Sequence, residues 1–137
     1  HRTSTNSSQI SLANTNNTFA IYMMKLVLEW LQEQGGIAAV ERQNTAKAKM
    51  LYDLIDQSDF YLGSAHPDHR STMNVTFNLA NNDLLDDFLA KALDGGLYAL
   101  KGHRNVGGVR ASIYNAMPLA GCEALAEFMR EFERSNS

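Results

Sequence analysis

Residues 73–79 read Met-Asn-Val-Thr-Phe-Asn-Leu, a strict alternation of apolar and polar side chains. Successive side chains of a β-strand point to opposite faces, so the four apolar residues would share one face and the three polar residues the other. The stretch predicts a strand with one buried and one solvated face, and it is the clearest strand signal in the chain.

Helices and shorter strands are predicted on both sides of this strand. The patterns indicate four helices: about 18–34, about 37–57, one that follows Asn82 or Asp83 and ends at Gly95-Gly96, and one that begins near Pro118 and frays from residue 133. Further strands are expected at 60–62, 97–100 and 109–114. This order predicts an α+β fold with a small three- to four-stranded antiparallel or mixed sheet and helices packed on one face.

The second of these helices has an apolar stripe and a charged side. The stripe contains Val40, Leu51, Leu54 and Ile55, whereas the charged residues fall mostly elsewhere: Glu41, Arg42, Lys47 and Lys49. The pattern is typical of a half-exposed helix.

The first helix and the residues before it differ in composition. Residues 3–17 are dominated by Ser, Thr and Asn, which predicts a polar linker or arm in 1–17. The helix at 18–34 carries apolar residues around nearly its whole circumference. Such a helix must be covered on several sides, so one face is expected to meet another domain or subunit. Residues 18–137 are assigned to one small domain.

The composition is that of an ordinary globular protein. The chain has 137 residues, 45% of them hydrophobic and 20% charged, a net charge of -3 and a pI near 5.7. This balance argues against a nucleic-acid surface. The most apolar stretch, 19–31, is too short for a membrane helix and contains two charged residues. The single cysteine, Cys122, fits a cytoplasmic protein and is expected to be a small buried residue rather than a nucleophile.

Two histidines raise the question of a metal site. His66 and His69 are three residues apart, but no cysteine or third histidine lies at a zinc-site spacing from them. No metal site is therefore expected.

The chemically most informative stretch is residues 100–112, Leu-Lys-Gly-His-Arg-Asn-Val-Gly-Gly-Val-Arg-Ala-Ser. It contains three glycines and four cationic or potentially cationic side chains: Lys101, His103, Arg104 and Arg110. Arginine binds carboxylate or phosphate through a bidentate fork, and glycine lets the backbone approach a ligand closely. In a chain of net negative charge, the stretch indicates a local anion site, with a solvated hairpin that binds nothing as an equal alternative.

Several stretches resemble the C-terminal part of the phosphoserine aminotransferases. The resemblance covers nearly the whole chain from Asn14 onward. The shorter matching stretches are Asn14-Thr15 before residues 18–22, Glu29-Trp30-Leu31, Gly35-Gly36, residues 55–61 and residues 70–75. Two longer motifs follow: Leu-Lys-Gly-His-Arg at 100–104 and Val-Gly-Gly-Val-Arg-Ala-Ser-Ile-Tyr-Asn-Ala at 106–116. The last two motifs are the most specific.

The resemblance implies the α+β small domain of a two-domain, homodimeric, fold-type I transaminase that uses pyridoxal 5'-phosphate. Such an enzyme moves an amino group between glutamate and 3-phosphohydroxypyruvate, giving 2-oxoglutarate and O-phospho-L-serine in serine biosynthesis. A second role in vitamin B6 (pyridoxine) synthesis stays open. The implied partners are a large cofactor-binding domain, a second subunit and these small anionic substrates, with no nucleic acid and no membrane.

The family's site residues match five positions of this chain. The arginine that matches Arg110 holds the substrate α-carboxylate. The residues that match His103 and Arg104 reach from the partner subunit to the substrate phosphate or to the distal carboxylate of glutamate. The residues that match Asn14 and Thr15 reach the cofactor phosphate across the dimer. Where the family usually has two prolines after that pair, this chain has Asn16-Asn17, which leaves the arm less rigid.

The resemblance implies no catalytic residue within this chain. In the family, the Schiff-base lysine lies upstream, in the large domain, and none of the lysines here matches it: Lys25, Lys47, Lys49, Lys91 and Lys101. The chain alone is then expected to be inactive. Two alternatives stay open: a stand-alone anion-binding or regulatory module without catalysis, and a related desulfurase or other transaminase, which would need only one carboxylate held.

Overall fold

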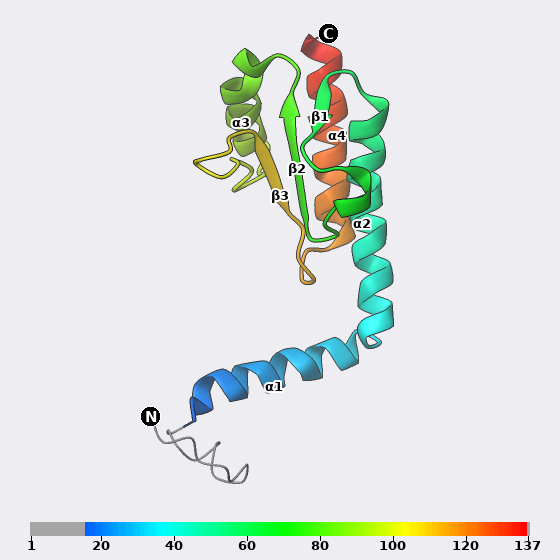
Figure 1. Cartoon of the computed structure of the whole chain (residues 1–137), viewed down its shortest axis with the longest axis vertical. Helices are drawn as coiled ribbons and strands as arrows, with labels where there is room; N and C mark the ends of the chain where they lie inside the picture. The colour runs from blue at the N-terminus through cyan, green and yellow to red at the C-terminus, as the bar shows by residue number, and fades with distance from the viewer. Residues whose placement is uncertain (1–15, 137) are drawn as a thin grey trace, which may run out of the picture. The chain divides into compact units, whose positions relative to one another are not determined.

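The computed structural model describes residues 16–136 (Figure 1). Contacts divide the chain into two units, one that ends at Ala39 and one that runs from Val40 to Ser137. The division falls just inside α2 (Ile37–Gln57), so α1 (Thr18–Glu33) belongs to the first unit. The assignment of 1–17 to an arm and of 18–137 to one domain stays a prediction.

Helix α1 has a capped start and a glycine stop. The side-chain oxygen of Asn17 accepts a hydrogen bond from the backbone N–H of Ala20 at 3.0 Å, which satisfies one of the free N–H groups at the helix start. After the helix, Gly35 and Gly36 adopt φ angles of 94° and 80°, which glycine tolerates without strain. No residue of α1 is buried, and Phe19 is 72% exposed. Among the described residues, the apolar side chains of α1 therefore lack full cover.

The second unit is built on a three-stranded antiparallel sheet in the order β1-β2-β3. Its strands are β1 (Tyr61–Gly63), β2 (Asn74–Leu79) and β3 (Val109–Ser112). The alternation predicted for β2 is confirmed, because Val75, Phe77 and Leu79 are buried while the residues between them are half-buried or exposed.

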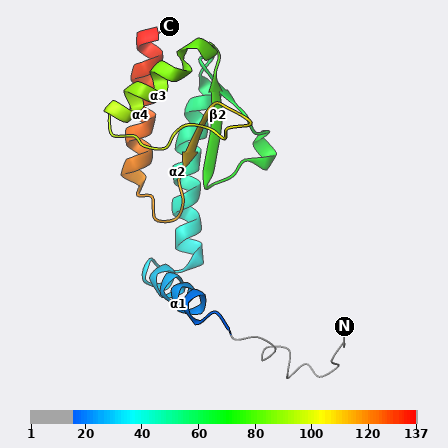
Figure 2. The same ribbon diagram turned by 90° about the vertical axis from the view of Figure 1, so that its left-hand side faces the viewer.

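Helices α2, α3 (Leu85–Asp94) and α4 (Leu119–Asn136) contribute to the core on the buried face of the sheet, and Figure 2 shows α3 and α4 on the same side of it. Short 3-10 turns at Pro67–His69 and Asn82–Leu84 connect these elements. The predicted α+β fold with helices on one face of a small antiparallel sheet is confirmed.

Aromatic side chains fill the centre of this core. The ring of Phe88 is fully buried, and its centroid lies 5.0 Å from those of Phe128 and Phe132 in edge-on geometry. The hydroxyl of Tyr61 donates to the carbonyl of Met129 at 2.8 Å, so this buried phenol has a partner. Burial also raises the pKa of Tyr61, which keeps the phenol neutral.

The predicted strand at 97–100 is wrong. In this segment, Ala99 has a φ of 60°, a left-handed conformation that an extended strand excludes. The N–H of Leu97 donates instead to the carbonyl of Ala92 at the end of α3, at 2.8 Å. Pairing with β3 is limited to a single bridge between Lys101 and Val109, so the sheet has three strands in the described part of the chain.

Two predicted boundaries also differ. The cap of the third helical segment is Asn81, whose side-chain oxygen accepts from the N–H of Asp83 at 3.1 Å, rather than Asn82 or Asp83 itself. Helix α4 does not fray from residue 133 but continues to Asn136. The reason is local: Glu133 accepts a hydrogen bond from Ser58 at 2.7 Å, and the side chain of Asn136 donates to the carbonyl of Phe132 at 2.7 Å.

Candidate anion-binding site

The cationic stretch folds as a hairpin that leads into β3, drawn in yellow beside β3 in Figure 1. Its two arms are joined by main-chain hydrogen bonds. The N–H of Arg110 donates to the carbonyl of Leu100 at 2.7 Å, and the N–H of Gly102 donates to the carbonyl of Gly108 at 2.8 Å. The backbone alone therefore sets the shape of the hairpin and leaves its cationic side chains free to point outward.

Two glycines are required for this shape. A Cβ atom on Gly102 would lie 1.9 Å from the carbonyl oxygen of Gly107, and one on Gly108 would lie 2.2 Å from Oδ1 of Asn78. Gly108 also has a φ of 68°, in the left-handed region. The glycines thus serve close backbone packing within the hairpin and against β2.

The tip of the hairpin presents His103 and Arg104, both exposed. The carbonyl of His103 accepts from the N–H groups of Val106 and Gly107, at 2.9 and 2.8 Å, which closes the turn. Its Nδ1 accepts from the N–H of Asn105 at 3.2 Å. A neutral His103 therefore carries its proton on Nε2 and can donate it to an incoming anion.

Arg110 lies on the solvated face of the sheet, away from the tip. It pairs with Thr76 across β2 and β3, and its side chain is exposed. On the same face, Ser112 donates to Asn74 at 3.3 Å. Hydrogen bonding to Asn74 and Ser112, together with the positive charge of Arg110, lowers the pKa of Tyr114. Arg110, Ser112 and Tyr114 therefore form one polar row beside β2.

The sequence interpretation missed Tyr114 as a site residue. The signal was available, because residues 110, 112 and 114 follow a strand's two-residue period and so share one face. The structure adds that the phenol of Tyr114 lies within electrostatic range of the Arg110 guanidinium.

The predicted site residues are placed in two groups. His103 and Arg104 form the tip, Arg110 lies on the sheet, and Asn14 and Thr15 lie outside the described residues. Within residues 16–136, neither Arg104 nor Arg110 takes part in an ion pair. Two separated cationic positions without internal counter-ions suit a ligand that carries an anion at each end.

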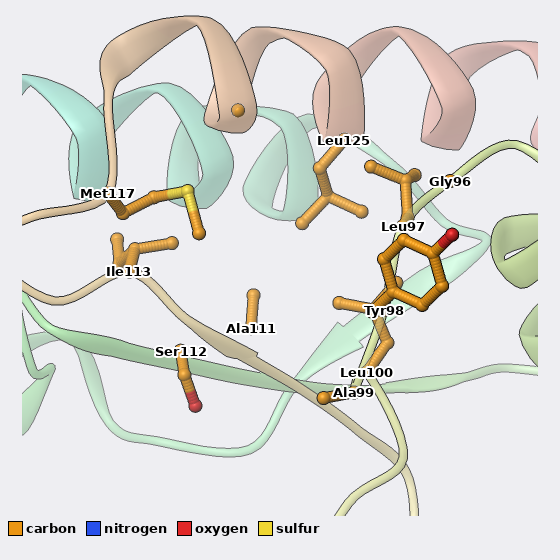
Figure 3. Close-up of a pocket in the computed structure, with 11 residues that line it drawn as sticks. Gly96, Leu97, Tyr98, Ala99, Leu100, Ala111, Ser112, Ile113, Met117 and Leu125 are labelled. Carbon is orange, nitrogen blue, oxygen red and sulfur yellow. The ribbon is translucent and has the colours of Figure 1, made fainter.

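The structure also contains an apolar pocket apart from the cationic residues of the hairpin tip and Arg110. A pocket of about 370 Å³ lies between residues 96–100, the buried face of β3 and the start of α4, and Figure 3 shows that Leu97, Ile113, Met117 and Leu125 are among the side chains that line it. Its lining contains no charged residue. It therefore offers an anion no cationic side chain.

Neither a reactive cysteine nor a metal cluster occurs among the described residues. Cys122 is 1% exposed, and burial raises the pKa of its thiol, which confirms the prediction of a buried structural residue. No group of three or more metal-ligating side chains that could hold an ion occurs between residues 16 and 136. Over the same range, none of the helices is both long enough and apolar enough to cross a membrane.

Four of the five lysines already have partners in the described structure. Lys25, Lys49 and Lys91 are exposed and paired with carboxylates one helical turn away. Lys47 is buried and donates to three carbonyls. Lys101 is exposed on the hairpin. That the covalent anchor of the cofactor lies outside this chain stays a prediction.

Comparison with known proteins gives a consistent family. A family model described as aminotransferase class-V matches residues 1–125. Similar curated proteins are the phosphoserine aminotransferases of Geobacillus kaustophilus, 59% identical over 125 residues, and of Bacillus subtilis, 56% identical over 127 residues. These matches cover 90% and 92% of this chain but 35% of each relative. The chain thus spans about a third of the length of the relatives it matches.

Solved structures agree with this result. The phosphoserine aminotransferase from Bacillus circulans subsp. alkalophilus matches 95% of this chain and 36% of that chain, with a TM-score of 0.86 and 49% identity. The pyridoxal-phosphate-bound phosphoserine aminotransferase from Trichomonas vaginalis matches 89% of this chain and 36% of that chain, with a TM-score of 0.79 and 36% identity. From its sequence and its fold, the chain belongs to the class-V aminotransferase family.

Proposed function

We propose that this chain is the C-terminal part of a phosphoserine aminotransferase and supplies its contacts to the anionic ends of the substrates. The complete enzyme would transfer an amino group between glutamate and 3-phosphohydroxypyruvate, giving 2-oxoglutarate and O-phospho-L-serine. The observation that carries the proposal is the hairpin, which separates the His103–Arg104 tip from Arg110 on the sheet and leaves neither arginine in an ion pair with another described residue.

Each group would hold one end of the substrate. The guanidinium of Arg110 can bind an α-carboxylate through two parallel hydrogen bonds, with the Tyr114 hydroxyl beside it. Arg104 and Nε2 of His103 can bind the distal anion, which is the phosphate of one substrate and the γ-carboxylate of the other. Fixing both ends orients the α-carbon, and such positioning contributes strongly to rate.

The remaining steps belong to residues outside the described part of the chain. Pyridoxal phosphate, when bound, supplies the electron sink for amino transfer. Asn14 and Thr15 are proposed to contact its phosphate across a homodimer, and His103 and Arg104 to serve the site of the partner subunit. A cytoplasmic location and the serine-biosynthetic role belong to the same proposal, with pyridoxine synthesis as a further possible pathway.

The competing function is an anion-binding module without catalysis. The two are separated by assaying the full-length protein for amino transfer from glutamate to 3-phosphohydroxypyruvate, with absorbance of the bound cofactor as a second readout. The proposal expects a yellow, active enzyme whose Arg110→Lys variant loses affinity for both substrates, because lysine cannot form the bidentate fork. A colourless full-length protein that binds phosphoserine without transferring an amino group would support the module.

A further inference from the structure

Lys47 is a buried cation whose partners are all main-chain carbonyls. The side chain lies on α2 and the residue is 2% exposed. Its Nζ donates to the carbonyls of Ile113 at 3.1 Å, Tyr114 at 2.8 Å and Met117 at 2.9 Å. These bonds use all three protons of the ammonium group. Among the described carboxylates none forms an ion pair with Lys47.

A second side chain of α2 binds the same segment. Asn44, one helical turn before Lys47, is 4% exposed, and its Nδ2 donates to Oδ1 of Asn115 at 2.7 Å. Residues 113–117 are the connection between β3 and α4 in Figure 1. Lys47 and Asn44 together therefore attach this connection to α2 through side-chain hydrogen bonds rather than through a sheet.

The anchored connection follows directly on the strand that carries Arg110. The N–H of Ile113 donates to the carbonyl of Met73 at 2.9 Å, which extends the pairing of β2 and β3 up to the residue that Lys47 binds. At the other end of the strand, the N–H of Arg110 donates to the carbonyl of Leu100. The short strand is thus held at both ends, and a shift of the 113–117 connection would shift Arg110 and Tyr114 with it.

A buried charge is a costly way to fill this space. Burial lowers the pKa of Lys47, although Cys122 nearby acts in the opposite direction. An apolar side chain of similar length would avoid the desolvation penalty but would leave three carbonyls without a donor. The advantage of the ammonium group is directional, since it fixes three carbonyls at once.

We propose that Lys47 is a positioning residue for the candidate substrate site: by binding the carbonyls of residues 113, 114 and 117 it fixes the C-terminal end of β3 and so the direction of Arg110. This inference rests on the proposed function, because the consequence of misplacing Arg110 is read as lost affinity for the α-carboxylate. It assigns Lys47 no contact with substrate or cofactor.

The test is a double-mutant cycle in the full-length enzyme. Lys47→Met keeps the length of the side chain and removes its charge. We expect KM for glutamate and for 3-phosphohydroxypyruvate to rise on the order of tenfold, with kcat of the folded enzyme changed less than about twofold. A purely structural defect would instead reduce the active fraction, which lowers apparent kcat and leaves KM unchanged.

The second half of the cycle asks whether Lys47 acts through Arg110. In an Arg110→Ala background, Lys47→Met should not raise KM further, since the group it positions is absent. Lys49→Met is the matched control: this lysine lies on the same helix, exposed and paired with Asp53, and its variant should behave as the unsubstituted enzyme. If Lys47→Met does not fold, Asn115→Ala, at a half-buried position, should give a smaller rise in KM with the same dependence on Arg110.

The outcomes separate the two proposals. An inactive unsubstituted enzyme would overturn the proposed function itself. An active enzyme in which folded Lys47→Met keeps its KM, or in which the effects of Lys47→Met and Arg110→Ala multiply, would overturn the positioning role alone.

Discussion

The two ends of β3 are held in opposite ways. At the N-terminal end, main-chain hydrogen bonds and close-packed glycines shape the hairpin, and its cationic side chains are turned outward without ion pairs among the described residues. At the C-terminal end, a cationic side chain is turned inward, and Lys47 binds the carbonyls that leave the strand. The buried cation thus serves structure, whereas the exposed cations carry the proposed binding.

Removing the buried ammonium group of Lys47 should have the largest effect on the free energy of unfolding. Lys47→Ala leaves three carbonyls without their donor and opens a cavity, so the free energy of unfolding should fall by about 3 kcal/mol. Urea unfolding of the chain measures this. Lys49→Ala on the same helix loses only an exposed ion pair and should cost about 0.5 kcal/mol or less. Equal losses for the two lysine variants would remove the contrast between the two ends of the strand.

At the other end of the strand, the backbone should be the sensitive part. In Gly102→Ala, the new Cβ would meet the carbonyl of Gly107, so we expect a loss of about 2 kcal/mol and faster exchange of the residue 102 amide. Gly107→Ala is the control, because its Cβ would meet no atom within 4 Å and only its φ of 77° is unfavourable. The control should lose less and keep the 102–108 hydrogen bond. A protected residue 102 amide in Gly102→Ala would contradict this picture of the hairpin.

Asn115 offers a smaller test of the C-terminal anchor. Asn115→Ala removes the oxygen that accepts from Asn44 and should lower the free energy of unfolding by about 1 kcal/mol. Arg104→Ala, at the opposite end, removes an exposed side chain and should change it by less than about 0.5 kcal/mol. Thermal unfolding of both variants shows which of them loses more stability. A larger loss for Arg104→Ala would mean that the tip carries structure rather than binding.

The polar row on the sheet can be followed by titration. Since hydrogen bonding to Asn74 and Ser112 lowers the pKa of Tyr114, Ser112→Ala should raise that pKa toward the ordinary value of 10, as measured by NMR of the ring. A pKa lowered by folding adds stability above the ordinary value, and this contribution is lost as the pH falls through the folded-state pKa. An unchanged pKa of Tyr114 in Ser112→Ala would mean that Ser112 does not interact with the Tyr114 phenol, and would contradict the polar row.

Local pattern predicted most of the fold. The alternation at 73–79 identified β2, and the two glycine pairs marked the ends of α1 and α3. The strand predicted at 97–100 failed because Ala99 adopts a left-handed conformation, which an alanine does not signal in a sequence. The continuation of α4 was missed because it depends on Ser58, 75 residues away from Glu133.

The candidate site was predictable only in part. Residue type alone pointed to Lys101, His103, Arg104 and Arg110, with a hairpin that binds nothing as an equal alternative. The family resemblance singled out the last three, and their binding roles stay predictions. Lys47 was grouped with the charged residues that lie mostly outside the apolar stripe, but it is one of the buried residues of α2, together with Val40, Asn44 and Leu51. The spacing of seven and four residues to Val40 and Leu51 placed Lys47 on the apolar face, but lysine there makes sense only once the carbonyls of residues 113–117 are seen.

The central claim of the proposed function is that one substrate is held at two separate positions, its distal anion by the His103–Arg104 tip of one subunit and its α-carboxylate by Arg110 of the other. The most direct measurement is the ratio of kcat/KM for 3-phosphohydroxypyruvate over hydroxypyruvate, which lacks the phosphate, in full-length Arg104→Ala and Arg110→Ala variants. We expect Arg104→Ala to reduce this ratio by about tenfold or more. The lost guanidinium would contact the phosphate of 3-phosphohydroxypyruvate, and hydroxypyruvate has no phosphate to lose that contact. Arg110→Ala should lower kcat/KM for both keto acids by a similar factor, because both carry the α-carboxylate, and should leave the ratio nearly unchanged. An unchanged ratio in Arg104→Ala, or an equal fall in both variants, would contradict the two-position account.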